Sequence, residues 1–174
     1  IYAIKHQSAW ETVFCTDYFS MPSIVLKKTL IFLPVIGLYF LRSGAIPISR
    51  DQGINALKKM GRNAKLAVKE KRSMMIFPQG TRVNLGISAQ EKPYLPGVFF
   101  LYSQSKVPVI PVAHNAGLVW PKNSFMKYPD RVSSKAITLE ILPEIPPGLP
   151  KKEFLKQLEK AIENTSNKLI NMEK

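Results

Sequence analysis

The sequence predicts an α/β domain with a mostly parallel or mixed central sheet flanked by helices. Short apolar segments typical of buried strands alternate with helix-like segments along the 174 residues. The length and the apolar content of 45% fit a single domain with its own core, which we place over residues 1–174. Fourteen prolines set boundaries and argue against long uninterrupted helices.

The first half of the chain follows this alternation. We expect, in order, a strand at 1–5, a helix at 8–19, a strand at 23–26, a largely helical apolar segment ending at 41, a strand at 45–49 and a helix at 51–71. Ser8 and Asp51 are favourable N-caps, Pro22 ends the first helix and Pro34 breaks the apolar segment. The apolar face of the last helix comprises Ile54, Leu57, Met60, Ala64, Ala67 and Val68, and its other face is basic.

The second half of the chain continues the pattern. We expect a strand at 73–77, a polar loop at 78–97, a short helix at 98–104, a strand at 107–113, an irregular segment at 115–132, a strand at 136–142 and a helix at 151–172. The last strand alternates apolar and polar residues, and the last helix carries an apolar stripe. The segment between them is rich in proline.

The longest apolar run, residues 30–41, has twelve residues and is too short to span a bilayer, which takes about 20. Lys27 and Lys28 precede it and Arg42 follows it. These features favour a buried core helix, with a segment at a membrane surface as the alternative. No signal peptide is recognisable, and a chain that opens at Ile1 inside a strand is expected to be a fragment that lacks its start.

The net charge of +13 calls for an anionic partner, which can be a nucleic acid, lipid headgroups or a phosphorylated small molecule. The single cysteine, Cys15, excludes an intrachain disulfide and fits a reducing compartment. It lies in an apolar part of a predicted helix, so we expect a buried, unreactive thiol rather than a nucleophile.

Candidate catalytic residues follow the first strand. His6 and Glu11 in KHQSAWE can act as a general base and its orienting carboxylate if His6 lies in the turn and Glu11 in the first helical turn. Glu11 also fits a capping box with Ser8, so spacing alone leaves both interpretations open.

Three other segments lie where sites in such sheets are found, near strand ends. Arg50, at the end of GAIPISR, suits phosphate recognition, or is a solvated surface residue. FPQGTR, at 77–82, suits an oxyanion or phosphate site, or is an ordinary glycine turn. The prolines at 108 and 111 in VPVIPVA line a groove or, the interpretation we favour, mark a strand edge or the beginning of a strand.

Taken in order, these four segments resemble the motif blocks of the glycerolipid acyltransferases. KHQSAWE resembles the family's HxxxxD/E box, GAIPISR its second block, FPQGTR a third block that is usually FPEGTR, and VPVIPVA its fourth. The resemblance is to bacterial 1-acyl-sn-glycerol-3-phosphate acyltransferases and covers residues 1–114. It implies a glycerol-3-phosphate acyltransferase-like fold. Members of the family begin with hydrophobic helices ahead of the His box, so this chain is expected to lack an N-terminal hydrophobic segment.

The resemblance also implies roles. His6 matches the catalytic base and Glu11 its acidic partner, where Asp is commoner. The residues that match phosphate-binding positions are Arg50, Gly80, Thr81 and Arg82. The accessory candidates are Ser8 and Gln79. Gln79 departs from the usual Glu and cannot act as a base.

The implied reaction transfers an acyl group from coenzyme A or acyl carrier protein to the free hydroxyl of 1-acyl-sn-glycerol 3-phosphate, which gives phosphatidic acid. No metal or other cofactor is expected, since two separate histidines and one cysteine offer no ligand cluster. The expected partners are the lysophospholipid, the acyl thioester, acyl carrier protein and an anionic membrane surface, with no nucleic acid. The expected location is the cytoplasmic face of a bacterial inner membrane, facing lipid through the cations of residues 51–71 and 27–28.

Other interpretations stay open. Glycerol 3-phosphate or another lysolipid can be the acceptor, since the His box is common to these enzymes. A nucleic-acid-binding domain would need a continuous cationic stripe, and a lipid-binding module would not depend on His6. His114 is expected to be a hydrogen-bonded loop residue. Trp10 and Trp120 fit core, groove or membrane-interface positions.

Overall fold

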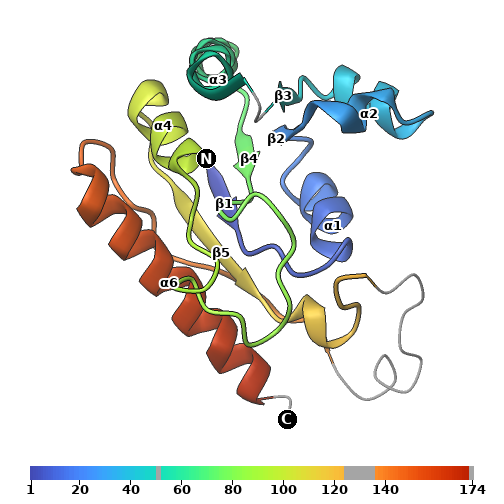
Figure 1. Cartoon of the computed structure of the whole chain (residues 1–174), viewed down its shortest axis with the longest axis vertical. Coiled ribbons are helices and arrows are strands. Elements are labelled where there is room, and N and C mark those ends of the chain that lie inside the picture. Colours follow the sequence, from blue (N-terminus) through green and yellow to red (C-terminus); the bar gives the residue numbers. More distant parts are fainter. Residues whose placement is uncertain (50–51, 124–135, 173–174) are drawn as a thin grey trace.

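A computed structural model of the chain describes residues 1–49, 52–123 and 136–172. Within them, six strands form one sheet in the order β3-β2-β4-β1-β5-β6 (Figure 1). The strands are β1 (Tyr2–Ile4), β2 (Ser23–Lys27), β3 (Ile46–Ile48), β4 (Met74–Ile76), β5 (Ile110–His114) and β6 (Leu139–Ile141). Neighbouring strands are parallel except β5 and β6, so the predicted mixed sheet is confirmed.

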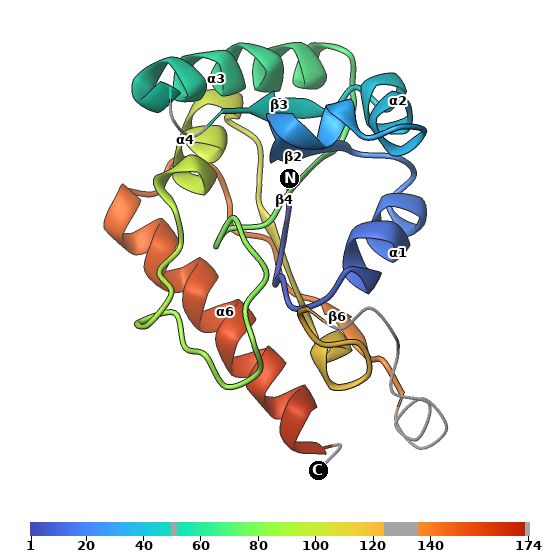
Figure 2. The ribbon, with the colours of Figure 1, turned by 45° about the vertical axis from the view of Figure 1, so that its right-hand side comes forward.

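Helices cover both faces of this sheet, as Figures 1 and 2 show. They are α1 (Trp10–Tyr18), α2 (Ile36–Arg42), α3 (Gly53–Lys69), α4 (Pro96–Ser105) and α6 (Lys151–Met172), with the short 3₁₀ helices η1 (Lys28–Phe32) and η3 (Ala116–Leu118). One core cluster joins α3, α4 and α6 to the sheet, and a second joins α1 and α2 to it. The predicted helix-covered architecture is therefore confirmed.

The pleat of the strands distributes neighbouring residues between the two cores. Ala3 and Ile76 pack under α3, α4 and α6, whereas Ile4 and Met75 pack under α1 and α2. Consecutive strand residues point to opposite faces, so strands of only three residues contribute to both layers.

Most predicted elements are present with shifted ends. α1 begins at Trp10 rather than at residue 8, and its N-cap is Ala9, so the prediction of Ser8 as the N-cap is wrong. Ser8 instead belongs to a turn that the Glu11 side chain closes. α4 begins at Pro96, two residues earlier than expected, since proline is well tolerated in the first helical turn. α6 has the predicted bounds. The predicted strand at 136–142 is limited to β6.

The apolar side of α3 is shorter than predicted. Met60, Ala64 and Ala67 are buried, but Ile54 is 67% exposed. The first buried side chain of the helix is Ala56, so its first turn lies outside the core and the prediction for Ile54 is wrong. The expected cap, Asp51, lies outside the described residues.

The apolar run at 30–41 is not a buried core helix, and that prediction is wrong. Its break at Pro34 is confirmed, since η1 ends before this proline and α2 begins after it. Ile31 and Phe40 contact the core under α1 and α2, which leaves the other side of the segment outside. Phe32, Val35 and Leu38 are 72%, 82% and 62% exposed.

The proline-bearing strand β5 lies inside the sheet, between β1 and β6, so the strand-edge interpretation is wrong for Pro111. Ile110 bonds to β1 through its N–H, and the next residue, Pro111, therefore turns its backbone towards β6. The Pro111 carbonyl accepts from the N–H of Leu142, just beyond the end of β6. The missing N–H of this proline thus falls where the ladder ends. Pro108 precedes β5, as a proline at the beginning of a strand should.

Candidate active site

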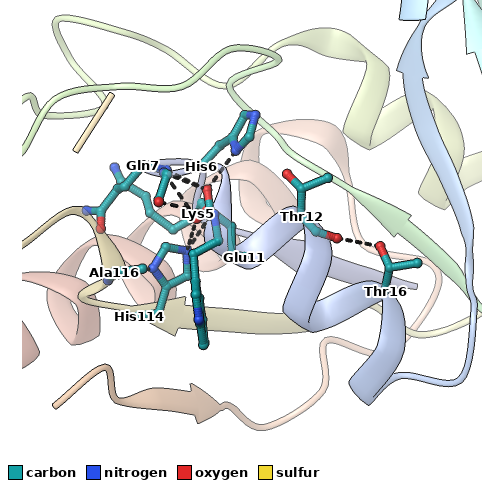
Figure 3. Close-up of polar contacts among 10 residues, drawn as sticks. Lys5, His6, Gln7, Glu11, Thr12, Thr16, His114 and Ala116 are labelled. Carbon is teal, nitrogen blue, oxygen red and sulfur yellow. Dashed lines mark hydrogen bonds and ion pairs between the residues drawn. The ribbon is translucent and has the colours of Figure 1, made fainter. Parts of the chain in front are cut away.

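His6 and Glu11 form the centre of the candidate active site. His6 follows β1 and Glu11 lies in the first turn of α1, which is the arrangement that their spacing required. Nδ1 of His6 is 2.8 Å from Oε1 of Glu11 (Figure 3). The Glu11 side chain is fully buried and the His6 side chain is 16% exposed. The imidazole is therefore accessible to a ligand, and the carboxylate behind it is not.

Glu11 also closes the turn before α1. Its Oε1 accepts hydrogen bonds from the backbone N–H groups of Gln7 and Ser8, both at 2.8 Å. The Ser8 hydroxyl accepts in turn from the N–H of Trp10 at 3.1 Å. Spacing alone left the bond to the Ser8 backbone and the contact with His6 as alternatives. One carboxylate makes both. Ser8 belongs to the same turn.

The surroundings of Glu11 keep it ionised. Burial raises the pKa of its carboxyl. The hydrogen bond from His6, the positive charge that His114 and His6 carry when protonated, and the hydrogen bond from Ser8 together outweigh burial, so the pKa is lowered from the ordinary value. A carboxylate only accepts hydrogen bonds, so Nδ1 of His6 carries the hydrogen. Nε2 of His6 then has a free lone pair and can take a proton from a ligand.

The chain after β4 fixes the position of His6. Phe77 stacks on the His6 ring with the ring centroids 3.9 Å apart and an interplanar angle of 15°. The backbone N–H of Val83 donates to the His6 carbonyl at 2.8 Å. The first and third sequence segments are thereby joined, because β1 and β4 are neighbours in the sheet.

The third segment makes a tight turn beside His6. The N–H of Gly80 donates to the carbonyl of Phe77 at 2.8 Å, and Gly80 has a φ of 65°, a left-handed conformation that favours glycine. Gly80 and Thr81 line the same pocket as His6. The hydroxyl-bearing residue of this segment and the imidazole of His6 therefore face one pocket.

Gln79 lies in this turn, but it is not one of the described residues that line the pocket. Its side chain bonds to another part of the loop instead. It is 2% exposed, and its Nε2 donates to the carbonyl of Lys92 at 3.0 Å. An ionised glutamate, the usual residue of the resembling family, has no hydrogen to donate there. The departure from the family pattern thus has a local structural reason.

The structure describes one of the two predicted phosphate-binding arginines. Arg82 is half-buried and follows Thr81 on the loop beside the pocket. Arg50 lies outside the described residues. Ile48, two residues before Arg50, lines the pocket.

The pocket beside His6 has a volume of about 330 Å³. It extends from the carboxyl ends of the parallel strands to α3 and α4, and its apolar lining includes Ile24, Leu26, Leu30, Phe40, Met60 and Val98. Its polar side chains include Thr12, Lys27 and Thr81. Thr12 was not expected from the sequence, where its position next to Glu11 was the only signal. This shape suits an apolar ligand whose polar end meets His6.

The second histidine, His114, lies behind Glu11 at the end of β5 and is fully buried. Its Nε2 is 2.7 Å from the carbonyl of Lys5, and its Nδ1 accepts from the N–H of Ala116 at 3.2 Å. These partners fix a neutral ring with the hydrogen on Nε2. Burial lowers the pKa of His114, against the opposing charge of Glu11, whose Oε2 lies 4.0 Å from Nε2. The expected hydrogen bonds of His114 are confirmed, but its expected place in a loop is wrong, because it is the last residue of β5.

Cys15 is fully buried in α1, and burial together with Glu11 raises the pKa of its thiol to about 12. A nucleophilic cysteine must form a thiolate, so the expected unreactive thiol is confirmed.

Lys5, directly before His6, is anchored to the C-terminal helix. Its Nζ lies 2.6 and 2.7 Å from the two carboxylate oxygens of Glu163, and the hydroxyl of Tyr94 donates to the same carboxylate at 2.9 Å. Burial and the neighbouring Glu163 raise the pKa of Tyr94, which keeps it a donor. Sequence reasoning missed this group, since Lys5 and Glu163 are 158 positions apart.

Comparison with known proteins identifies the family. The family model described as Acyltransferase matches residues 1–115, which contain His6, Glu11 and the segments around them. The chain belongs to the acyltransferase family.

Relatives of this chain include 1-acyl-sn-glycerol-3-phosphate acyltransferases from bacteria and from human. The protein of Pseudomonas aeruginosa is 38% identical over 128 residues, which are 74% of the chain and 49% of the relative. The human beta form is 29% identical over 122 residues, which are 70% of the chain and 41% of the relative. The chain thus spans about half or less of the length of the curated relatives that it matches.

The fold of this member of the family also has a solved counterpart. The crystal structure of the 1-acyl-sn-glycerophosphate (LPA) acyltransferase PlsC from Thermotoga maritima matches with a TM-score of 0.76 and 20% identity. The match covers 97% of the chain and 65% of that structure, and it supports the fold. In the part of the chain that the structure describes, no helix is long and apolar enough to cross a membrane.

Proposed function

We propose that this acyltransferase transfers an acyl group from an acyl thioester to the free hydroxyl of 1-acyl-sn-glycerol 3-phosphate, giving phosphatidic acid in phospholipid biosynthesis. The observation that carries the proposal is the His6–Glu11 pair at the end of an apolar pocket. The substrate class agrees with the names of the relatives from Pseudomonas aeruginosa and human.

The proposed mechanism uses His6 as a general base. Nε2 of His6 removes the hydroxyl proton of the acceptor, and the oxygen attacks the carbonyl carbon of the thioester. The carbon–sulfur bond then breaks, and the leaving thiolate takes the proton back from the imidazolium. Glu11 holds the Nδ1 hydrogen throughout and stabilises the transient positive charge.

The remaining residues of the pocket position the substrates in this proposal. The apolar lining receives an acyl chain, which gains free energy by leaving water. Arg82, with Arg50, holds the phosphate of the acceptor, since guanidinium groups bind phosphate oxygens in pairs. Gly80 and Thr81 form the wall next to His6. No metal or other cofactor is needed, because the thioester is already activated.

The decisive experiment measures thiol release from acyl-coenzyme A, and then from acyl carrier protein, with this chain. Thiol that appears with 1-acyl-sn-glycerol 3-phosphate and not with glycerol 3-phosphate supports the proposed acceptor. Thiol that appears with glycerol 3-phosphate and not with 1-acyl-sn-glycerol 3-phosphate would identify glycerol 3-phosphate as the acceptor. No thiol with either acceptor and either donor contradicts the enzyme function.

The first prediction concerns the base. His6→Ala lowers kcat about 10²- to 10⁴-fold, because general-base catalysis contributes about that factor. Cys15→Ala, in the same helix–turn unit but with an unreactive thiol, is the matched control and keeps its activity. Equal losses in the two variants would assign His6 a structural role.

The second prediction concerns the phosphate. Arg82→Ala raises the Michaelis constant for the lysophospholipid about 10- to 100-fold, because a hydrogen bond to a charged group contributes about 1.5–3 kcal/mol. Lys92→Ala, an exposed cation on the same loop, leaves the constant unchanged. A normal Michaelis constant in Arg82→Ala would remove Arg82 from the site.

A further inference from the structure

Exposed apolar side chains gather on one side of the molecule. Of the sixteen large hydrophobic side chains that are exposed among the described residues, eleven lie between residues 13 and 41. Figures 1 and 2 both show α1 and α2 on the same side, opposite α6. Scattered exposed apolar residues are common, but a group of this size marks an interaction surface.

These residues form a continuous surface that joins α1 to α2. Trp10, Phe14 and Tyr18 are spaced four apart and stack in sequence, with ring centroids 4.3 and 5.5 Å apart. At the end of this ladder, the hydroxyl of Tyr39 donates to Sδ of Met21 at 2.8 Å and so links α2 to the turn after α1. We call the exposed side chains between residues 13 and 42, with Trp10, the apolar face.

Basic residues flank the apolar face, and acidic residues are missing from most of it. The sequence contains no Asp or Glu between Asp17 and Asp51. Lys27, Lys28 and Arg42 lie in this interval and are exposed. This combination is complementary to anionic lipid headgroups above an apolar layer. It disfavours a second copy of the chain as the partner, since a symmetric contact would bring the same cations together.

The apolar face also adjoins the pocket. Leu30 belongs to the face and lines the pocket beside His6, and so does Lys27. A surface resting on lipid at this position would open the pocket towards the membrane. The aromatic ladder suits the same position, because Trp and Tyr are enriched where a bilayer meets water.

We propose that the apolar face inserts into the headgroup layer of an anionic bilayer, so that the lysophospholipid reaches His6 from the membrane. Phe32, Val35 and Leu38 enter the acyl layer, and Lys28 and Arg42 contact the headgroups. The delivery of substrate rests on the proposed function, whereas the insertion itself does not.

The test of insertion uses vesicles of phosphatidylglycerol and phosphatidylcholine in equal parts, and the full chain. A polarity-sensitive fluorophore is attached to Val35→Cys or, as the matched control, to Met172→Cys at the far end of α6, where the native side chain is 70% exposed. The buried Cys15 does not compete for the label. We expect a blue shift on the anionic vesicles at position 35 and none at position 172.

Substitutions then measure the contribution of the face to binding. Leu38→Asp weakens vesicle binding at least about ten-fold, since an inserted leucine is lost from the apolar layer. Met172→Asp, which changes an equally exposed side chain, leaves binding unchanged. Lys28→Gln and Arg42→Gln each weaken it about five-fold, whereas Lys151→Gln and Lys152→Gln on α6 do not. Unchanged unfolding midpoints show that the variants are folded.

Other results overturn the proposal. Equal blue shifts at positions 35 and 172, equal losses in Leu38→Asp and Met172→Asp, or no binding of the unmodified chain would each do so. A dimer in light scattering that Leu38→Asp converts to a monomer would assign the face to a second copy. A lowered unfolding midpoint in Leu38→Asp would show that the side chain supports the fold.

An activity measurement separates this proposal from the proposed function. With lysophospholipid embedded in vesicles, Leu38→Asp lowers kcat/KM at least about ten-fold, in step with its binding. With a short-chain, monomeric lysophospholipid in water, Leu38→Asp is as active as the unmodified chain. If neither protein has activity but the labelled position 35 still enters lipid, the reaction is refuted and the insertion stands.

Discussion

The two histidines of the site have the same side chain but opposite hydrogen placement, and their partners decide which is which. Glu11 accepts the Nδ1 hydrogen of His6 and leaves Nε2 of that ring free beside the pocket. In His114, the Lys5 carbonyl and the Ala116 N–H occupy both nitrogens. A ring with both nitrogens engaged cannot exchange a proton with a ligand. The local hydrogen bonds therefore leave His6 as the ring that can exchange a proton in the proposed mechanism, whereas His114 is held in place on both sides.

The third prediction, also at the residue scale, concerns His114 and pH. Its folded-state pKa is lowered from the ordinary 6.5 by burial, so the unfolded chain binds a proton first as the pH falls. The free energy of unfolding therefore decreases below about pH 6.5, by at most about 1.4 kcal/mol per pH unit for one proton. His114→Gln keeps a donor and an acceptor but does not titrate, and should reduce this slope. Urea unfolding measures this slope, from neutral pH down to the pH at which carboxyl groups begin to titrate. The same pH dependence in the unmodified chain and in His114→Gln would contradict the assignment of the slope to His114.

At the scale of elements, the loop after β4 and the helix α6 together hold the two residues that follow β1. The Val83 N–H bonds to the carbonyl of His6, and Glu163 of α6 bonds to the side chain of Lys5. Tyr94, from the same loop, donates to Glu163. Two consecutive residues of the chain are thus fixed by elements that follow much later in the sequence.

The fourth prediction tests this anchoring. Glu163→Ala leaves the ammonium group of Lys5, which is 3% exposed, without its partner, and removing one member of a buried ion pair costs about 3–5 kcal/mol. Glu153→Ala, an exposed carboxylate on the same helix, costs less than about 1 kcal/mol. Urea unfolding of both variants measures the difference. Similar losses would show that Lys5 reaches water or another partner.

The elements that sequence reasoning predicted well are those whose cause is local. Alternation of apolar segments predicted the mixed sheet, and Pro34 predicted the break between η1 and α2. Hydropathy, however, does not distinguish an apolar side chain in the core from one on a surface, so Phe32 and Leu38 were assigned to the core although they are exposed. The spacing of His6 and Glu11 predicted their contact only if His6 lay in the turn after the strand and Glu11 in the first turn of the helix. The bond between Lys5 and Glu163 depends on the tertiary fold and left no local pattern.

At the scale of the whole molecule, the pocket lies where the two cores meet. Leu26 and Phe40 belong to the core under α1 and α2, and Met60 and Val98 belong to the core under α3, α4 and α6. All four line the pocket. A ligand bound there would contact both layers, so it should raise the unfolding temperature of the domain as a unit.

The fifth prediction concerns the net charge of +13. Association with anionic vesicles weakens as salt is raised above about 0.1 M, where charges more than about 10 Å apart are largely screened. A salt-resistant remainder persists, because insertion of Leu38 and its neighbours does not depend on charge. Binding that does not change with salt would contradict a role for the cations. Displacement from vesicles by duplex DNA would instead favour a nucleic-acid surface.

The three hydrogen bonds that converge on one oxygen of Glu11 also bear on how such a sequence can change over evolutionary time. Two of the bonds shape the main chain at the start of α1, and the third orients His6. A mutation that removes the carboxylate would weaken this turn and, in the proposed mechanism, proton transfer as well, so selection on either property preserves the residue. Glu11 is therefore under two constraints. A compensating change that restores only the turn before α1, or only the orientation of His6, does not make up for its loss.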